Sequence, residues 1–362
     1  MTGADPRGDT VTGAEPRPRL RDVAPYTSPQ LDVAARLNTN ECPHPLPETF
    51  FEQLAEAVRT LPLHRYPDSQ MRRLREDLAD TVGHSFEGTW TANGSNEILV
   101  ELLHAYGGPG RRALTFEPTY LLHSRLCWLT HTDVERRSLP SDFVMTDRQV
   151  DEAVHASPDV VFVCSPNNPT GNVQPSPIVG SLAERLPSAL IVVDEAYVEF
   201  GGETALPLVA EHPNVAVVRT FSKAFALAGA RIGYVLTSPA IVGDLERVRL
   251  PYHASSLTQA AGIIALRHRP EALAILDSIR VQRDRILDAL RAIDGVTVFP
   301  SDANFVLFVP SDDAKALWQR LLDHGVLVRD MTSVVPNALR VTAGTEHEVD
   351  LFLKAIDEEL RR

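Results

Sequence analysis

Four short polar segments of the sequence contain residue types that could act together on a small molecule. They are residues 93–97 (NGSNE), 165–171 (SPNNPTG), 194–197 (DEAY) and 222–231 (SKAFALAGAR). The amine of Lys223 can form a Schiff base with a carbonyl carbon, and the carboxylate of Asp194 can pair with a cationic group. Ser222 and Arg231 offer hydrogen-bond donors to an anion. Together the segments offer an amine, an acid and donors for a phosphate.

The surroundings of these segments predict that they meet at one edge of a sheet. Three of them follow apolar runs rich in β-branched residues, which are typical of strands covered on both faces. Ligands of parallel sheets bind beyond the carboxyl ends of the strands. The prolines around Asn167 and Asn168 predict a rigid turn, and the carboxylates of Asp194 and Glu195 need a cationic partner if they are buried. Gly94 opens a helix whose first N–H groups can bind an anion.

Helical and strand-like segments alternate along most of the chain. The predicted helices span residues 51–61, 71–82 and 96–106, and the predicted strands span 112–116, 160–164, 190–193, 215–220 and 233–236. Strands separated by helices require crossover connections, so we expect an α/β fold with a mostly parallel sheet between helices. After residue 251 the predicted order is a helical region at 258–290, strands at 296–299 and 304–309, a helix at 313–324, strands at 326–329 and 339–342, and a helix at 346–360.

This order of elements predicts two domains and an N-terminal extension. The large domain is expected at residues 48–255, and a smaller α+β domain at 256–362. Residues 20–47 are expected to form an N-terminal arm. Residues 1–19, which are rich in Pro, Gly, Arg and Asp and have no apolar signal core, are expected to be a disordered leader.

Composition excludes several classes of partner. The net charge of −13 disfavours nucleic acid and anionic membranes, and it means that an anionic substrate needs a local cationic pocket. Three widely spaced cysteines without a CxxC pair, and twelve histidines without ligand spacing, predict neither disulfide framework nor metal site. No apolar run approaches the roughly 18 residues that span a bilayer. We therefore expect a cytoplasmic protein.

The four polar segments match the needs of a pyridoxal phosphate enzyme. Such an enzyme requires a lysine for the Schiff base, an acid beside the pyridine nitrogen and donors for the phosphate group. A carboxylate at the pyridine nitrogen keeps the ring protonated, so that the ring accepts electrons from the substrate. An asparagine and a tyrosine that donate to the ring oxygen would lower the pKa of the Schiff base.

The same segments resemble those of fold-type I aminotransferases, and more narrowly the histidinol-phosphate aminotransferase family. The resemblance covers roughly residues 20 to 360 in the family's order and spacing. Supporting stretches are residues 37–41 (LNTNE), 65–68 (RYPD), 301–305 (SDANF), 325–330 (GVLVRD) and 339–344 (LRVTAG). It implies a homodimer with shared active sites and ping-pong transfer of an amino group from histidinol phosphate to 2-oxoglutarate, in histidine biosynthesis.

The resemblance also implies a role for each matching residue. Lys223 would carry the cofactor as an aldimine and move the substrate proton, and Asp194 would pair with the pyridine nitrogen. Tyr120 would stack on the ring, and Tyr66 would reach the phosphate from the second subunit. The remaining cofactor contacts would come from Asn168 and Tyr197 at the ring oxygen and from Ser95, Asn96, Ser222 and Arg231 at the phosphate. The substrate contacts would come from Arg340, Arg329, Tyr26 and Asn40.

Simpler interpretations stand beside these roles. A lysine after a strand is commonly a solvated surface residue, and Asp194 could be a helix N-cap. Tyr120 and Tyr66 could pack within their own chain. Arg340, which interrupts an apolar strand, could belong to a structural ion pair, because an unpaired buried guanidinium is unfavourable.

Two departures from the family pattern affect the substrate. Residues 40–45 read NECPHP where relatives often have NENPYG, and residues 121–128 are bulkier than expected. Alternative activities on the same fold are transamination of an aromatic or specialised-metabolite amino acid, and decarboxylation. A non-catalytic regulatory protein would lack the lysine or the aspartate, or would carry a DNA-binding module.

Overall fold

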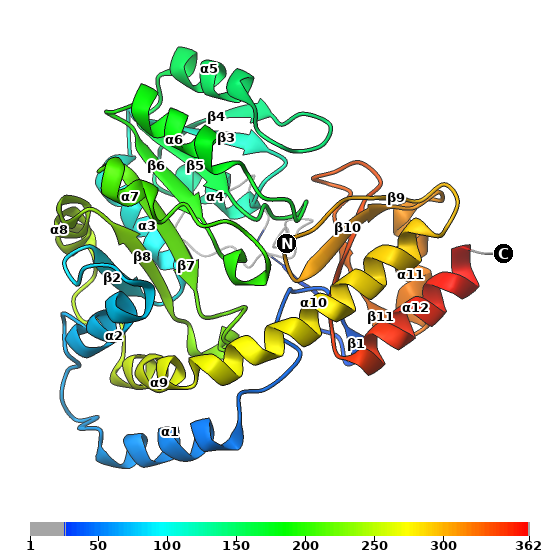
Figure 1. Ribbon diagram of the computed structural model, residues 1–362, viewed down its shortest axis with the longest axis horizontal. Helices are drawn as coiled ribbons and strands as arrows, with labels where there is room; N and C mark the ends of the chain where they lie inside the picture. The colour runs from blue at the N-terminus through cyan, green and yellow to red at the C-terminus, as the bar shows by residue number, and fades with distance from the viewer. Residues whose placement is uncertain (1–24, 26, 361–362) are drawn as a thin grey trace, which may run out of the picture. The chain divides into compact units, whose positions relative to one another are not determined.

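The largest sheet of residues 32–362, which form one compact unit, has seven strands (Figure 1). The structure is a computed structural model that describes residue 25 and residues 27–360. The strands lie in the order β2, β8, β7, β6, β5, β3, β4, and only the pairs that include β8 are antiparallel. The predicted α/β fold with a mostly parallel sheet is confirmed. The strands are β2 (Thr89–Ala92), β3 (Arg112–Glu117), β4 (Asp133–Ser138), β5 (Val160–Cys164), β6 (Leu190–Asp194), β7 (Val215–Thr220) and β8 (Gly233–Thr237).

Helices cover both faces of this sheet (Figure 1). Along β5, Val161 packs with one apolar cluster while its neighbours Val160 and Phe162 pack with the other. This alternation explains why the strands are apolar at every position. The helices are α1 (Glu48–Thr60), α2 (Arg72–Val82), α3 (Ser95–Tyr106), α4 (Leu121–Leu129), α5 (Asp147–Ala156), α6 (Ser176–Arg185), α7 (Leu208–Glu211) and α8 (Pro239–Val248).

A second, four-stranded sheet follows in the C-terminal part of the chain. Its strands lie in the order β12 (Arg329–Asp330), β13 (Leu339–Thr342), β10 (Phe305–Val309) and β9 (Thr297–Val298). Helices α10 (Arg269–Arg291), α11 (Ala314–Asp323) and α12 (Glu346–Leu360) supply apolar residues to the core of this sheet. The short strands β1 (Ala35–Arg36) and β11 (Val326–Leu327) pair in parallel. None of the helices described is both long and apolar enough to cross a lipid bilayer.

The structure differs from the sequence expectation at a few elements. Strand β2 was not predicted because it has only four residues, two of them threonine. Strand β4 was not predicted because it lies at the sheet edge and four of its six residues are charged. The helical region predicted at 258–290 is divided at His268 into α9 (Ser256–Arg267) and α10, with Pro270 in the first turn of α10. The division into domains at residue 255 stays a prediction, and the predicted leader lies outside the described residues.

Parallel pairing brings the ends of β5, β6 and β7 to one edge of the large sheet. Cys164 is the register partner of Asp194, which in turn pairs with Val218. Beyond the strands, Ser165 N donates to Asp194 O at 2.9 Å and Glu195 N donates to Val218 O at 2.8 Å. The segments that begin at Ser165, Asp194 and Phe221 therefore leave the sheet side by side, as the sequence predicts.

Glu195, the residue that follows β6, forms a buried ion pair, as expected for a carboxylate directly after a buried strand. The Arg219 guanidinium lies 2.9 Å from its carboxylate, and the backbone N–H of Ala205 and the hydroxyl of Thr204 also donate to it. Burial raises the pKa of Glu195, while Arg219 acts in the opposite direction. The pair holds the turn after β6 to strand β7.

We predict that Arg219→Met lowers the free energy of unfolding by about 3–5 kcal/mol, because it leaves a buried carboxylate without its cation. Urea unfolding followed by circular dichroism measures the change. The exposed pair of Arg185 and Asp151 gives a matched control, since Arg185→Met should cost less than about 1 kcal/mol. Equal effects of the two substitutions would contradict the role of the Glu195–Arg219 pair.

Candidate active site

Lys223 is the only one of the three lysines in the sequence that does not lie on an exposed helix surface. It follows β7, and its Nζ donates to the backbone oxygen of Thr39 at 3.0 Å. Burial, with a further contribution from the positive charges of Arg340 and Arg231, lowers the pKa of Lys223 to about 8, against the opposing effect of Glu41. A large fraction of this amine is therefore neutral, and nucleophilic, at slightly alkaline pH.

Asp194, at the end of β6, is 2% exposed and has a histidine as its partner. His123 Nε2 lies 3.0 Å from Asp194 Oδ2, and the backbone N–H of Ala196 donates to Oδ1 at 3.2 Å. The imidazole stacks on Phe162, with ring centroids 4.7 Å apart, and meets the edge of the Tyr120 ring at 5.4 Å. His123 thus fixes the orientation of the carboxylate.

Sequence reasoning missed His123. His123 lies on the first turn of α4, three residues after Tyr120. It belongs to the stretch 121–128, whose side chains are bulkier than the family pattern. A lone histidine has no spacing signal, so its contact with Asp194 becomes visible only when α4 packs over the sheet. A histidine three positions after the predicted stacking tyrosine was the available clue.

Arg340, on β13 of the small sheet, contacts the asparagine turn of the large one. Its Nη1 donates to Asn168 Oδ1 at 2.6 Å and its Nη2 donates to the backbone oxygen of Asn38 at 3.1 Å. The guanidinium carbon lies 5.1 Å from the centre of the Phe305 ring. Arg340 is 7% exposed, so its charge acts in a site with little water.

The charges of Arg340 and Asp194 act in opposite directions on the pKa of Tyr197. Burial raises the pKa of the Tyr197 hydroxyl to about 12, and the Asp194 carboxylate raises it too, whereas Arg340 and Asn40 lower it. The Asn40 amide donates to Tyr197 Oη at 3.0 Å, and its Oδ1 accepts from Thr342 Oγ1 at 3.0 Å. Because both ends of the Asn40 amide are engaged within the protein, Asn40 orients Tyr197.

A group of donors surrounds the N-terminus of α3. Arg231 Nη1 donates to Ser222 Oγ at 3.3 Å, and the Thr220 hydroxyl donates to Ser222 Oγ at 3.0 Å. A Cβ atom at Gly94 would lie 2.5 Å from Arg231 Nη2, and one at Gly233 would collide with the backbone nitrogen of Ser95. The absence of side chains at both glycines lets Arg231, Ser222 and the first turn of α3 approach each other, which creates an anion site.

The other predicted site residues differ in whether they contact the group of donors at the N-terminus of α3. Tyr120 Oη donates to Asn96 Oδ1 at 3.4 Å, which links the predicted stacking residue to the start of α3. Tyr66 is 78% exposed and stacks on Tyr252 at 4.4 Å, so within this chain it is not part of the group. Arg329 lies opposite Arg340 in the β12–β13 pair. The predicted residue Tyr26 lies outside the described residues.

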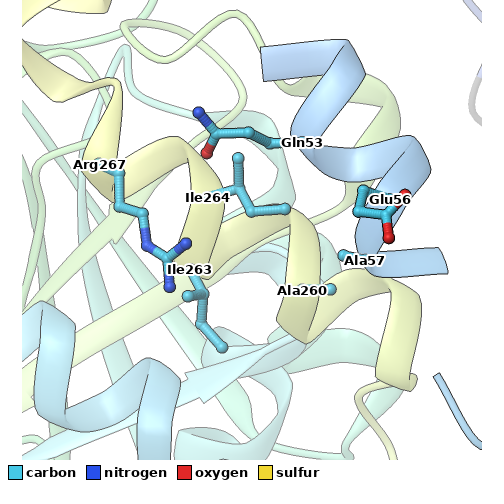
Figure 2. Close-up of a pocket in the computed structure, with 7 residues that line it drawn as sticks. All are labelled: Gln53, Glu56, Ala57, Ala260, Ile263, Ile264 and Arg267. Carbon is cyan, nitrogen blue, oxygen red and sulfur yellow. The ribbon is translucent and has the colours of Figure 1, made fainter. Parts of the chain in front are cut away.

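A cavity of about 430 Å³ opens elsewhere, between α1 and α9 (Figure 2). Its lining residues are Gln53, Glu56, Ala57, Ala260, Ile263, Ile264 and Arg267. None of the predicted site residues belongs to it. We therefore place the candidate active site at the edge of the large sheet, around Lys223, and not in this cavity.

The residues at the sheet edge fit pyridoxal phosphate. Lys223 offers an amine with a lowered pKa, and the buried Asp194 carboxylate offers a partner for a pyridine nitrogen. The buried His123 Nδ1 has no hydrogen-bond partner, while Nε2 is committed to Asp194. The cradle around Gly94, in which a Cβ would displace Arg231, matches a phosphate group.

Comparisons with known proteins agree with this fit. The family model for aminotransferases of class I and II matches residues 34–356. A histidinol-phosphate aminotransferase from Frankia casuarinae is 46% identical over 359 residues, which cover 95% of this chain and 90% of that protein. One from Thermobifida fusca is 46% identical over 94% of each chain.

A solved structure shows the same fold. The histidinol-phosphate aminotransferase from Sinorhizobium meliloti, in complex with pyridoxal-5'-phosphate, superposes with a TM-score of 0.86 at 25% identity. The match covers 95% of this chain and 97% of that one.

The lowered pKa of Lys223 predicts how the cofactor-free protein responds to pH. Capture of pyridoxal phosphate requires the neutral amine, so its rate should rise with pH and reach half its maximum near pH 8. Arg340→Leu should shift this midpoint upward, because it removes a positive charge that disfavours the ammonium form. Stopped-flow absorbance measures the rate, and Arg185→Leu, on an exposed surface, is the control. A midpoint near the ordinary lysine value of 10.5 would contradict the argument.

The contact of His123 with Asp194 makes a second prediction. His123→Phe keeps the stacking on Phe162 but removes the hydrogen bond to the carboxylate, so the dissociation constant for pyridoxal phosphate should rise by about tenfold or more. His123→Gln, which can still donate, should recover part of the affinity. Fluorescence titration of the cofactor-free variants tests this, with His155→Phe on the exposed face of α5 as control. If His123→Phe binds as tightly as the unchanged protein, His123 does not position Asp194.

Proposed function

The chain belongs to the class I and II aminotransferases, and we propose that it transfers the amino group of histidinol phosphate to 2-oxoglutarate with pyridoxal phosphate as cofactor. The observation that carries the proposal is the similarity to histidinol-phosphate aminotransferases at 46% identity over nearly the whole chain. The reaction would alternate between two half-reactions at one site, with glutamate as the second product. The chain would then serve histidine biosynthesis.

The lysine and the aspartate would act at opposite ends of the cofactor ring. When bound, pyridoxal phosphate supplies an aromatic ring that withdraws electrons from the substrate α-carbon. Lys223 would hold the cofactor, give way to the substrate amine and then carry the α-proton on Nζ. Asp194, oriented by His123, would keep the pyridine nitrogen protonated. The low pKa of Lys223 favours this use as a proton carrier near neutral pH.

The other residues would hold the cofactor in place. Asn168 and Tyr197 would donate to the ring oxygen, and the ring of Tyr120 would stack on the pyridine face. The phosphate group would be held by Ser95, Asn96, Ser222 and Arg231. The support for the phosphate contacts is the donor group at the N-terminus of α3, where two glycines permit a close approach.

Arg340 would bind the anionic end of either substrate. The guanidinium is buried beside Asn168, and a guanidinium can donate two hydrogen bonds to a phosphate or to a carboxylate. Such a local cation is required because the net charge of −13 repels anions from the molecule as a whole. Arg329 and Tyr26 would assist. Asn40 would act through Tyr197, to which its amide is bonded.

We further propose that the enzyme is a cytoplasmic homodimer with shared active sites. The support is the exposure of four large apolar residues, Leu63, Leu250 and the stacked pair Tyr66 and Tyr252, which are 44–78% exposed. Tyr66 would reach the phosphate of the second subunit from this exposed position. The three free cysteines support a reducing compartment. The large domain would span residues 48–255 and the small domain residues 256–362.

The substrate assignment is tested with the holoenzyme and histidinol phosphate. The absorbance of the cofactor should change from the Schiff-base form to the amine form, and 2-oxoglutarate should restore it. Lys223→Ala should abolish the change, whereas Lys315→Ala, on the exposed surface of α11, should preserve it. Aromatic amino acids and other donors, assayed in parallel, identify the first alternative, and release of carbon dioxide identifies a decarboxylase. A competent cofactor that responds to other donors but not to histidinol phosphate would refute the substrate.

A further inference from the structure

A second cluster of titratable side chains lies behind the N-terminus of α3, outside the residues assigned to the reaction. Glu97 and Glu101 lie one turn apart on α3, and His253 comes from the segment that follows α8. One oxygen of each carboxylate and one ring nitrogen of His253 all lie within 4.8 Å of one another. Glu101 is 4% exposed, so the cluster is not a solvated acidic surface.

The hydrogen bond of His253 to a backbone oxygen determines which of its ring nitrogens can act as an acceptor. Nε2 lies 3.1 Å from the backbone oxygen of Thr91. A carbonyl oxygen only accepts, so Nε2 carries the hydrogen, and Nδ1 of the neutral ring presents a lone pair. The buried Nδ1 has no hydrogen-bond partner. A histidine whose other nitrogen donates to a backbone carbonyl is the usual arrangement of a metal ligand.

Glu101 is oriented in the same way. The indole Nε1 of Trp90 donates to Glu101 Oε2 at 3.0 Å, and the buried Oε1 has no hydrogen-bond partner. Glu97 Oε2 accepts the backbone N–H of Asn93 at 2.5 Å. The two carboxyl groups and the imidazole thus lie close together, and two buried atoms of the cluster, Glu101 Oε1 and His253 Nδ1, lack a hydrogen-bond partner. Arg249, whose guanidinium carbon lies 5.5 Å from the centre of the Trp90 ring, brings a positive charge near the cluster.

We propose that Glu97, Glu101 and His253 bind one divalent cation of the zinc class. Two ligand atoms of a tetrahedral zinc ion stand about 3.3 Å apart, so the cluster, whose atoms lie within 4.8 Å of one another, binds the ion with a contraction of up to about 1.5 Å. One cation satisfies three acceptors at once, whereas a water molecule in the same volume can donate to only two. The imidazole nitrogen favours zinc over magnesium, which prefers oxygen ligands.

The cation would connect the segments that form the phosphate cradle. Glu97 N donates to Gly94 O at 3.1 Å, and the Asn93 amide donates to His253 O at 2.6 Å, so the ligands are bonded to the turn that precedes Ser95. An ion bound by α3 and His253 would hold this turn in place. It would also neutralise two carboxylates that lie within two turns of the expected phosphate. This consequence adds to the proposed function, while binding of the ion is independent of which substrate the enzyme uses.

The experiment removes bound metal from the holoenzyme with a chelator, adds zinc, and removes the unbound zinc by dialysis. Mass spectrometry of the metal content should give about one equivalent per chain, and cobalt in place of zinc should give the visible bands of a site with mixed nitrogen and oxygen ligands. Glu101→Gln keeps an acceptor for Trp90 but removes the charge, and should weaken zinc binding more than about tenfold. His253→Asn removes the ring nitrogen by an independent change, so failure of one variant to fold does not prevent the test.

A matched control is available on α11 and α12, where His324 faces Glu358 and Glu359. Arg320 already neutralises Glu359 at 2.8 Å, so His324→Asn should leave the zinc content unchanged. A holoenzyme that retains no zinc, or zinc binding that neither Glu101→Gln nor His253→Asn weakens, would overturn the proposal, and the cluster would then hold a proton or a water molecule.

Discussion

The parallel pairing of β6 with β5 and β7 is the constraint on which the rest of the site depends. Strands that run in the same direction end at the same edge, so the asparagine turn, Asp194 and Lys223 leave the sheet together although they are far apart in the sequence. A slip of one residue in β6 would turn Asp194 to the opposite face of the sheet. The apolar clusters on both faces hold the register, because each strand fills both with β-branched side chains.

Burial then determines which partners the ionisable groups of the site need and how their pKa values shift. Each ionisable group at the edge of the sheet has a partner from another element, such as His123 of α4 for Asp194 and Arg219 of β7 for Glu195. Arg340 extends this network to the small sheet through Asn168, and its charge also lowers the pKa of Lys223. A single guanidinium thus acts on the amine and provides the local cation that an acidic protein needs for anionic substrates. The contact between the two sheets is therefore made by residues of the candidate active site, Arg340 and Asn168.

Much of this arrangement could be predicted from the sequence, and the rest could not for physical reasons. Strands β5 and β7 and helix α12 coincide with their predicted limits because long apolar runs and helical periodicity are local signals. Strand β4 is polar and His123 is isolated, so only tertiary contacts reveal them. The contact of Asn40 with the substrate stays a prediction. Its bonds to Tyr197 and Thr342 could not be predicted, because they depend on the return of β13 to the N-terminal segment. The Glu97–Glu101–His253 cluster combines residues some 150 positions apart and has no sequence signature.

The central claim is that the amine of Lys223 and the carboxylate of Asp194 meet at one cofactor. Reduction of the holoenzyme with borohydride, followed by peptide mapping, fixes the cofactor to the lysine that holds it. We expect the label on Lys223 alone, and we expect Asp194→Asn to reduce its amount by weakening the retention of the cofactor. A label on Lys315 or Lys354 would contradict the account, as would full labelling of Lys223 by a cofactor whose affinity and spectrum do not respond to Asp194→Asn.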